Sequence, residues 1–257
     1  MKHKLPELIY EDLLPTRDYL QEVALVLGSL QRAYIPKHPR DWHYGLEVNL
    51  RGLITQPIKI ENKDIRASLD LVRNKFRIGK SSWLLNDYAA PEIYNNVRLW
   101  LESHGEKVDL ELPKFSSRSR HFNPQQAKNY ATALWWMETQ FHSLKTNLIE
   151  GLSSPILLFP HHFDLSLVWF PYNDDRQVAL GFSTGDETIP EPYLYLTAYP
   201  EPAGFTALQI PSKAFWQSDG FSGAILPYSA LSASSDPVTL FKDYTDAILN
   251  SVRPLFN

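Results

Sequence analysis

The sequence has no cysteine, and this absence removes several kinds of chemistry at once. Without a thiol the chain can form no disulfide, no thiolate metal site and no cysteine nucleophile. No run approaches the roughly 18 consecutive apolar residues of a membrane-spanning helix. The N-terminus lacks the apolar stretch of a signal peptide, and no Asn-x-Ser/Thr glycosylation sequon occurs. We therefore expect a cytoplasmic protein that has no membrane partner.

A strong charge of one sign is also lacking. The formal net charge is −4 and the isoelectric point is about 6.1. Such a chain has no global field that attracts nucleic acid, so we expect no nucleic-acid partner. What is present is typical of a globular protein, with 44% apolar and 13% aromatic residues. A length of 257 residues allows a sizeable core in one large domain or two small ones.

Hydrophobic periodicity predicts two successive runs of similar order. The first begins with a helix over 12–34, stopped by prolines, and ends with a helix over 91–105. The second begins with a helix over 124–151 and ends with a helix over 236–252, with Asp236 as N-cap and Pro237 at its first position. Between the helices we expect strands over 42–50, 58–60, 67–72, 75–78, 108–112, 156–159, 163–170, 178–182, 193–199 and 224–227.

The predicted fold class is therefore α+β, with two similar halves, each a long helix, antiparallel strands and a helix, packed into one compact unit. The halves are residues 1–113 and 124–257, and the polar segment 114–123 is the expected connector. The first long strands of the halves also align, HYGLEVNL with HFDLSLVW, which pairs His43 with His162. An internal duplication would account for this pattern, and it predicts a pocket at the boundary between the halves.

Several short motifs occur in a fixed order along the chain, and together the sequence resembles the uncharacterised bacterial family DUF5996, a domain of unknown function. The motifs are W-H-x-x-L-x-V from Trp42, R-G-L-x-T from Arg51, S-P at Ser154, F-D-L at Phe163, P-E-P at Pro190, A-Y-P-E-P-x-G-F from Ala198 and L-P-Y at Leu226. The resemblance implies no activity. It marks a set of polar positions for attention: His43, Arg51, Thr55, Asp164, Glu191, Tyr199, Glu201 and Tyr228.

The stretch His161-His162-Phe163-Asp164 has the residue types of a metal site. Adjacent histidines on a strand point to opposite faces, so only His162 and Asp164 would share one. These two side chains with His43 offer nitrogen and oxygen ligands that zinc or iron accepts. The alternative is that the histidines make structural hydrogen bonds at the start of a core strand.

GFSTG, at 181–185, matches the G-x-S-x-G pattern of hydrolases, but prolines follow instead of a helix. The hydrolase order also requires a histidine after the serine, and no histidine occurs beyond His162. We therefore interpret this stretch as a turn and do not expect an esterase.

The strand over 193–199 places Tyr193, Tyr195, Thr197 and Tyr199 on one face and leucines and alanine on the other. A tyrosine stripe with nearby charged groups is a common lining for a small-molecule site. The leading hypothesis is a small-molecule-binding protein or enzyme with a polar and aromatic pocket between the halves. Its candidate catalytic residues are Asp164, Glu201, Arg51 and His43, and its candidate ligand-binding residues are Tyr195, Tyr199, Tyr228, His162 and Glu191.

Two alternatives remain open at this point. One is a non-catalytic interaction or scaffolding protein whose motif residues are structural. The other is a metal-dependent enzyme that uses the histidine and aspartate side chains named above. The sequence identifies no cofactor, reaction or substrate, and it leaves the oligomeric state open.

Overall fold

The computed structural model describes residues 4–116, 122–148 and 150–256, so residues 117–121 of the predicted connector lie outside the described part. The chain forms two compact units. Unit 1 comprises Met1–Tyr10, Trp136–Ile156 and Asp164–Asn257, and unit 2 comprises Glu11–Trp135 and Leu157–Phe163. The two units are defined by which residues contact one another, whereas the predicted halves were defined by a repeated order of elements along the sequence. The division into units is therefore no test of an internal duplication.

The helices of unit 2 follow the predicted periodicity closely. α1 (Tyr10–Tyr34) buries Leu20, Val23, Leu27 and Leu30 completely, as their spacing predicts. α2 (Ala90–Ser103) has proline in its first turn, and the Glu92 carboxylate accepts a hydrogen bond from the backbone N–H of Ala89 at 2.7 Å. α3 (Pro124–Asn147) contributes its first half to this unit and its second half to unit 1.

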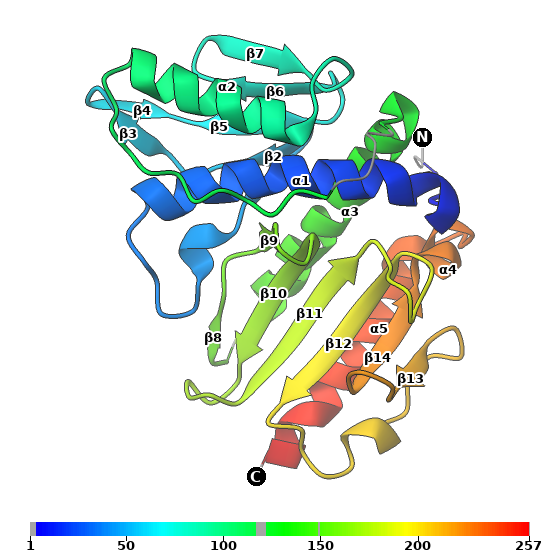
Figure 1. The fold of residues 1–257 in the computed structure, drawn as a ribbon. Helices are drawn as coiled ribbons and strands as arrows, with labels where there is room; N and C mark the ends of the chain where they lie inside the picture. Colours follow the sequence, from blue (N-terminus) through cyan, green and yellow to red (C-terminus); the bar gives the residue numbers. More distant parts are fainter. Residues whose placement is uncertain (1–3, 117–121, 149, 257) are drawn as a thin grey trace. The chain divides into compact units, whose positions relative to one another are not determined.

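The sheet of unit 2 is antiparallel throughout, in the order β1-β2-β5-β6-β7 (Figure 1). Leu53, Leu69 and Phe76 lie on one face of this sheet and are fully buried, and α2 lies across the sheet (Figure 1). A separate hairpin pairs β3 with β4. The strands are β1 (Glu47–Asn49), β2 (Gly52–Ile54), β3 (Ile58–Ile60), β4 (Lys63–Ile65), β5 (Ala67–Asp70), β6 (Lys75–Ile78) and β7 (Ser81–Leu84).

The predicted strand over 42–50 is wrong for most of its length. Residues Trp42–Tyr44 form a 3-10 turn, η1, Leu46 makes a single β-bridge with Leu158, and Glu47–Asn49 pair as a strand. Buried polar contacts replace strand pairing here, because the Gln31 side chain donates to the Gly45 carbonyl at 2.5 Å and accepts from the Gln56 N–H at 2.6 Å. Alternating hydrophobicity alone did not reveal these competing partners.

The predicted strand over 108–112 is also absent, since residues 106–116 contain no strand or helix. The Leu110 carbonyl accepts a hydrogen bond from the Tyr94 hydroxyl at 2.8 Å instead of from a neighbouring strand. This side-chain contact fixes one point of an otherwise irregular segment.

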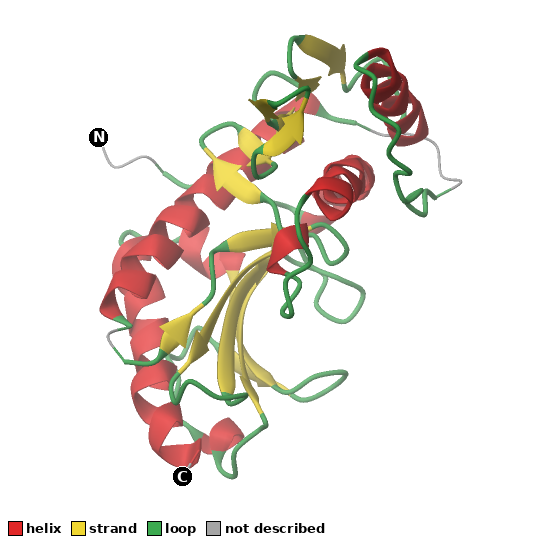
Figure 2. Cartoon of the chain, turned by 90° about the vertical axis from the view of Figure 1, so that its left-hand side faces the viewer, coloured by secondary structure: helices red, strands yellow, loops and turns green. Residues whose placement is uncertain are grey.

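The sheet of unit 1 runs β13-β14-β12-β11-β10-β8, again antiparallel. One face carries the buried residues Leu167, Leu180, Leu196 and Leu226, and Figure 2 shows helices lying on one side of this sheet. The second half of α3 contacts α5 (Pro237–Val252) through Phe141 and Phe241, whose ring centroids are 6.1 Å apart. The strands are β8 (Leu152–Ser153), β10 (Asp164–Phe170), β11 (Gln177–Ser183), β12 (Tyr193–Tyr199), β13 (Phe215–Gln217) and β14 (Gly223–Pro227).

Two local features hold the ends of this unit. The Asp236 carboxylate accepts a hydrogen bond from the Thr239 N–H, which confirms the predicted N-cap of α5. The short helix α4 (Tyr228–Ser232) begins with a buried tyrosine whose hydroxyl donates to the Pro6 carbonyl at 2.8 Å. The N-terminal segment is thereby tied to the end of β14.

The predicted fold class is confirmed. Each run begins with a long helix, continues through antiparallel strands and ends with a helix, which makes the protein α+β. None of the helices in the described residues combines the length and apolar character that crossing a membrane requires.

Candidate functional site

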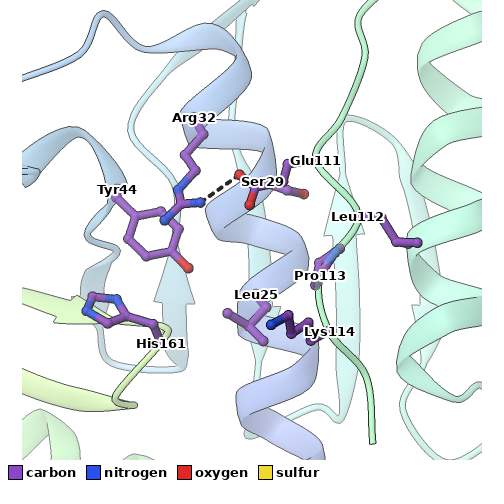
Figure 3. A pocket seen from close by; sticks show the side chains of 9 residues that line it. All are labelled: Leu25, Ser29, Arg32, Tyr44, Glu111, Leu112, Pro113, Lys114 and His161. Atoms are coloured by element: carbon purple, nitrogen blue, oxygen red, sulfur yellow. Dashed lines mark hydrogen bonds and ion pairs between the residues drawn. The ribbon is translucent and has the colours of Figure 1, made fainter.

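Unit 2 contains a pocket of about 400 Å³ between four parts of its own chain (Figure 3). One wall is the α1 face with Leu25, Ser29 and Arg32, which are spaced i, i+4 and i+7 and therefore share one side of the helix. The other lining residues come from η1, from the irregular segment after α2 and from the turn after β9 (Leu157–Phe159). They are Tyr44, Glu111, Leu112, Pro113, Lys114 and His161.

The Arg32 guanidinium is the central charged group of the pocket. It lies over the ring of Tyr44, 4.0 Å from the ring centroid, and donates to a Glu111 carboxylate oxygen at 2.6 Å. Although burial lowers the pKa of Arg32, the hydrogen bond to Glu111 and the negative charge of Glu111 contribute to a net increase. Arg32 is therefore a permanent cation, oriented by an aromatic face on one side and a carboxylate on another.

Tyr44 and His161 are neutral at physiological pH. Burial raises the pKa of the Tyr44 phenol, although the nearby Arg32 charge lowers it in part. Burial, with electrostatic repulsion from His162 and Arg32, lowers the pKa of His161 to about 4. Their rings are stacked with centroids 5.4 Å apart, so they present an uncharged aromatic surface beside the Arg32 cation.

A glycine on α1 makes the position of Tyr44 possible. A Cβ added at Gly28 would lie 2.5 Å from the ring atom Cε2 of Tyr44, so any side chain there would push the ring away. The turn that carries His161 is held by Gln21, whose side-chain amide donates to the His161 carbonyl at 3.0 Å. Two residues of α1 thus position aromatic groups that come from distant parts of the sequence.

The histidine pair is arranged differently from the prediction. His161 and His162 lie in a turn over 160–163 and not on the strand, which begins at Asp164. Their ring centroids are 4.2 Å apart, so they do not point to opposite faces as strand geometry would require. Phe163 ends the turn with a φ of +56°, which is not a strand conformation, so the strand begins one residue later than predicted.

A second polar cluster lies on the sheet of unit 1. The Tyr195 hydroxyl donates to Asp164 at 2.5 Å, and the Tyr193 hydroxyl donates to Asp186 at 2.8 Å. Burial, with the Asp164 charge and hydrogen bond, raises the pKa of Tyr195 well above its ordinary value. The register places Gly181 opposite Tyr195, and a Cβ there would lie 2.1 Å from the ring atom Cζ. The tyrosine therefore reaches Asp164 across a glycine.

The tyrosine stripe has the predicted register, but its ends lie far apart. Tyr193 pairs with Ser183, at the end of the sheet where β10 begins with Asp164, whereas Tyr199 pairs with Gln177. Six residues of extended chain separate the two tyrosines, a distance of roughly 20 Å. Glu201 follows Tyr199 and is exposed, so unit 1 does not bring it together with Asp164.

The remaining candidates of unit 1 have local partners. The buried Tyr228 hydroxyl donates to the Pro6 carbonyl, as described above, and Glu191 accepts a hydrogen bond from the Ser229 hydroxyl at 2.8 Å. In unit 2, Arg51 is half exposed with its Nε 3.7 Å from Asp70. His43 is buried and accepts a hydrogen bond from the His38 N–H at 3.2 Å, and His162 lies beside the pocket residue His161.

The metal alternative gains no support from these contacts. Within residues 4–116, 122–148 and 150–256, no group of three histidine, aspartate or glutamate side chains is arranged to hold an ion. His43 already accepts a backbone hydrogen bond through Nδ1. Asp164 already accepts the Tyr195 hydroxyl.

Sequence reasoning missed most of the pocket, including Arg32, Glu111, Lys114 and Ser29. One signal was present, because Ser29 is a polar residue within the mostly apolar run over 23–30 of α1, and Arg32 lies one turn further on. The other lining residues lie in segments without periodicity, so no pattern links them to α1.

The fold and the two clusters define an α+β protein with two helix–strand–helix runs and an arginine-centred pocket in one of its units. The model of a family of unknown function, DUF5996, matches residues 5–177 and 172–251, and the chain belongs to this family. The resemblance seen in the short motifs is thereby confirmed. Comparison with curated proteins and with solved structures gives no match.

Proposed function

We propose that the chain is a small-molecule-binding protein and that the pocket of unit 2 is its ligand site. Its volume of about 400 Å³ falls in the range of natural ligand sites. Its lining combines apolar side chains with a few fixed polar groups, which is the composition that ligand recognition requires. The observation that carries the proposal is the Arg32 guanidinium, held over Tyr44 at 4.0 Å and open to this pocket.

The proposal concerns recognition and assigns no reaction. The candidate residues Asp164, Tyr195 and Glu201 belong to unit 1, and the pocket described here is lined by unit 2 alone. A role for them in catalysis stays a prediction from the sequence. We also propose that the protein acts in the cytoplasm, because a chain without cysteine uses no oxidative stabilisation.

The first test is to identify what the purified protein carries. Native mass spectrometry of the untreated protein, followed by denaturation and small-molecule analysis, should find a bound compound in the wild-type chain. Leu112→Trp should reduce its occupancy, since Leu112 lines the pocket and is 65% exposed, so the larger ring can be accommodated without disturbing the core. Leu50→Trp is the matched control, because Leu50 is 68% exposed and does not line the pocket.

A ligand that is retained equally by both variants would place the site elsewhere. Thermal melting of each variant, with and without the recovered compound, separates loss of binding from loss of folding.

A further inference from the structure

We infer that the ligand is an anion with a carboxylate and a planar apolar part, and that its carboxylate takes the place of Glu111 on Arg32. This inference rests on the proposed ligand site in unit 2. It adds the chemical class of the ligand and gives Glu111 the role of an internal competitor.

Arg32 has capacity to bind a second acceptor. A guanidinium carries five N–H donors in one plane, and the described contacts use one of them, from Nη1 to Glu111 at 2.6 Å. The guanidinium carbon lies 4.0 Å from the Tyr44 ring centroid, so the ring covers one side of the guanidinium and the remaining donors must find acceptors elsewhere. A planar carboxylate is the group that matches this arrangement of donors.

Glu111 is weakly held in its present position. Its side chain is 66% exposed and that of Arg32 is 43% exposed, so water screens the ion pair and the contact contributes little stability. The segment 106–116 has no helix or strand. It is anchored through the Leu110 carbonyl on one side and the Ser116 N–H, which donates to Glu22, on the other. Between these two anchors Glu111 can leave Arg32 without unpairing a strand or a helix.

The charge of the lining favours an anion. Arg32 and Lys114 are the cations among the lining residues, and Glu111, which is paired with Arg32, is the one carboxylate among them. When Glu111 moves away, both cations are left for the ligand. A bound anion that stayed beside Glu111 would be repelled by it, so removal of the Glu111 charge strengthens binding in either arrangement.

The rest of the pocket fits a planar apolar group. Leu25, Leu112 and Pro113 supply aliphatic surface, and the exposed, neutral ring of His161 supplies an aromatic face. Aromatic rings stack on such faces at centroid distances of about 4.5–7 Å. An aromatic carboxylate therefore uses the charged group and the apolar walls together.

The test compares two probes of the same shape, naphthoate and its neutral amide naphthamide, by isothermal titration calorimetry with the whole chain. Naphthoate should bind at least about tenfold more tightly than naphthamide, because its carboxylate forms an ion pair with Arg32 in addition to hydrogen bonds, whereas the neutral amide forms hydrogen bonds alone. Glu111→Gln should tighten naphthoate at least about threefold and leave naphthamide unchanged. Arg32→Gln should abolish the preference for the anion.

The matched controls are Glu47→Gln and Arg66→Gln, which alter an exposed ion pair of unit 2 that does not line the pocket. Neither should change naphthoate binding. Arg32→Lys keeps the charge but loses the planar donors, so its preference for naphthoate over naphthamide should lie between those of Arg32→Gln and the wild type. A melting curve for each variant confirms that it is folded.

Three results would overturn the inference. Equal affinity for the two probes, or weaker naphthoate binding in Glu111→Gln, would show that the ligand is not held as an anion on Arg32. Failure of naphthoate to bind at about 1 mM would reject the ligand class. The proposed function survives any of these if the native protein still carries a compound that Leu112→Trp displaces, and it fails separately if no such compound is found.

Discussion

Replacing Gly181 with alanine tests how the tyrosine stripe of unit 1 is built. The added Cβ would lie 2.1 Å from Cζ, 2.2 Å from Oη and 2.4 Å from Cε1 of Tyr195. Ordinary contacts between such atoms are about 3.4 Å or longer, so the ring must move by more than an ångström. That movement takes the Tyr195 hydroxyl away from Asp164, to which the hydroxyl donates a hydrogen bond of 2.5 Å in the wild-type chain.

The expected cost combines two losses of stability with one smaller gain. Overpacking typically costs about 1–3 kcal/mol, and loss of a hydrogen bond to a charged group costs about 1.5–3 kcal/mol. Alanine offsets about 0.4–1 kcal/mol of this by restricting the unfolded chain. We expect Gly181→Ala to lower the free energy of unfolding by about 2–4 kcal/mol, and the melting temperature by about 10 °C.

A double-mutant cycle with Tyr195 isolates the cause. In a Tyr195→Ala background the added methyl group has room, so Gly181→Ala should then cost less than about 0.5 kcal/mol. Tyr195→Phe keeps the ring and removes the hydroxyl, so in this background Gly181→Ala should still lower the free energy of unfolding, by less than it does in the wild type. Urea unfolding of the wild type, the three single variants and the two double variants gives the free energies, and an equal cost of Gly181→Ala in the wild-type and Tyr195→Ala backgrounds would refute the reasoning.

Three further predictions concern stability. Asp236→Ala should lower the free energy of unfolding by about 1 kcal/mol, because it removes the N-cap of α5, whereas Asp236→Asn should keep most of the capping stabilisation; thermal denaturation followed by circular dichroism measures both. Gly52→Ala should cost about 3 kcal/mol or more, because φ is +143° and a Cβ would lie 2.3 Å from the Leu69 carbonyl oxygen; a melting point within 2 °C of wild type would contradict this. The His161 pKa of about 4 lies below its ordinary value of 6.5, so the folded state binds fewer protons between these pH values and stability rises with pH across them. Relative to His161→Gln, the wild-type chain should therefore gain stability in urea unfolding as the pH is raised from 4 to 6.5, and parallel curves would contradict the low pKa.

The parts of the fold that could be predicted from sequence are those whose local signals agree. The helix α5 has its cap, a proline at the first position and apolar residues at helical spacing, and its observed bounds match the prediction. β12 has strict alternation bounded by prolines and was predicted residue for residue. In both elements local chemistry and burial favour the same structure, so no distant contact was needed to define them.

The failures occur where distant side chains determine the backbone. Residues 42–46 alternate as a strand would, but the Gln31 amide from α1 holds the Gly45 carbonyl and a 3-10 turn forms. Likewise Leu110 is fixed by the Tyr94 hydroxyl and not by a neighbouring strand. Neither contact leaves a periodic signal in the sequence.

The pocket could not be predicted for a related reason. It joins α1, the segment around Glu111 and the turn at His161, which are separated by many residues along the chain. The sequence drew attention to the histidines as residues that can bind a metal. The structure gives His161 a different environment, a ring stacked on Tyr44 and close to the Arg32 charge.

The chain crosses between the two units four times, after Tyr10, Trp135, Ile156 and Phe163. No single peptide bond can therefore be cut to release either unit as one continuous fragment. A protease that cleaved within 117–121 would leave Leu158 on a different fragment from Leu46, although their backbones exchange hydrogen bonds of 2.8 and 2.9 Å. Such a nicked protein should stay associated by these contacts until a denaturant is added, so a gel of the native protein and a gel run under denaturing conditions would give different sizes.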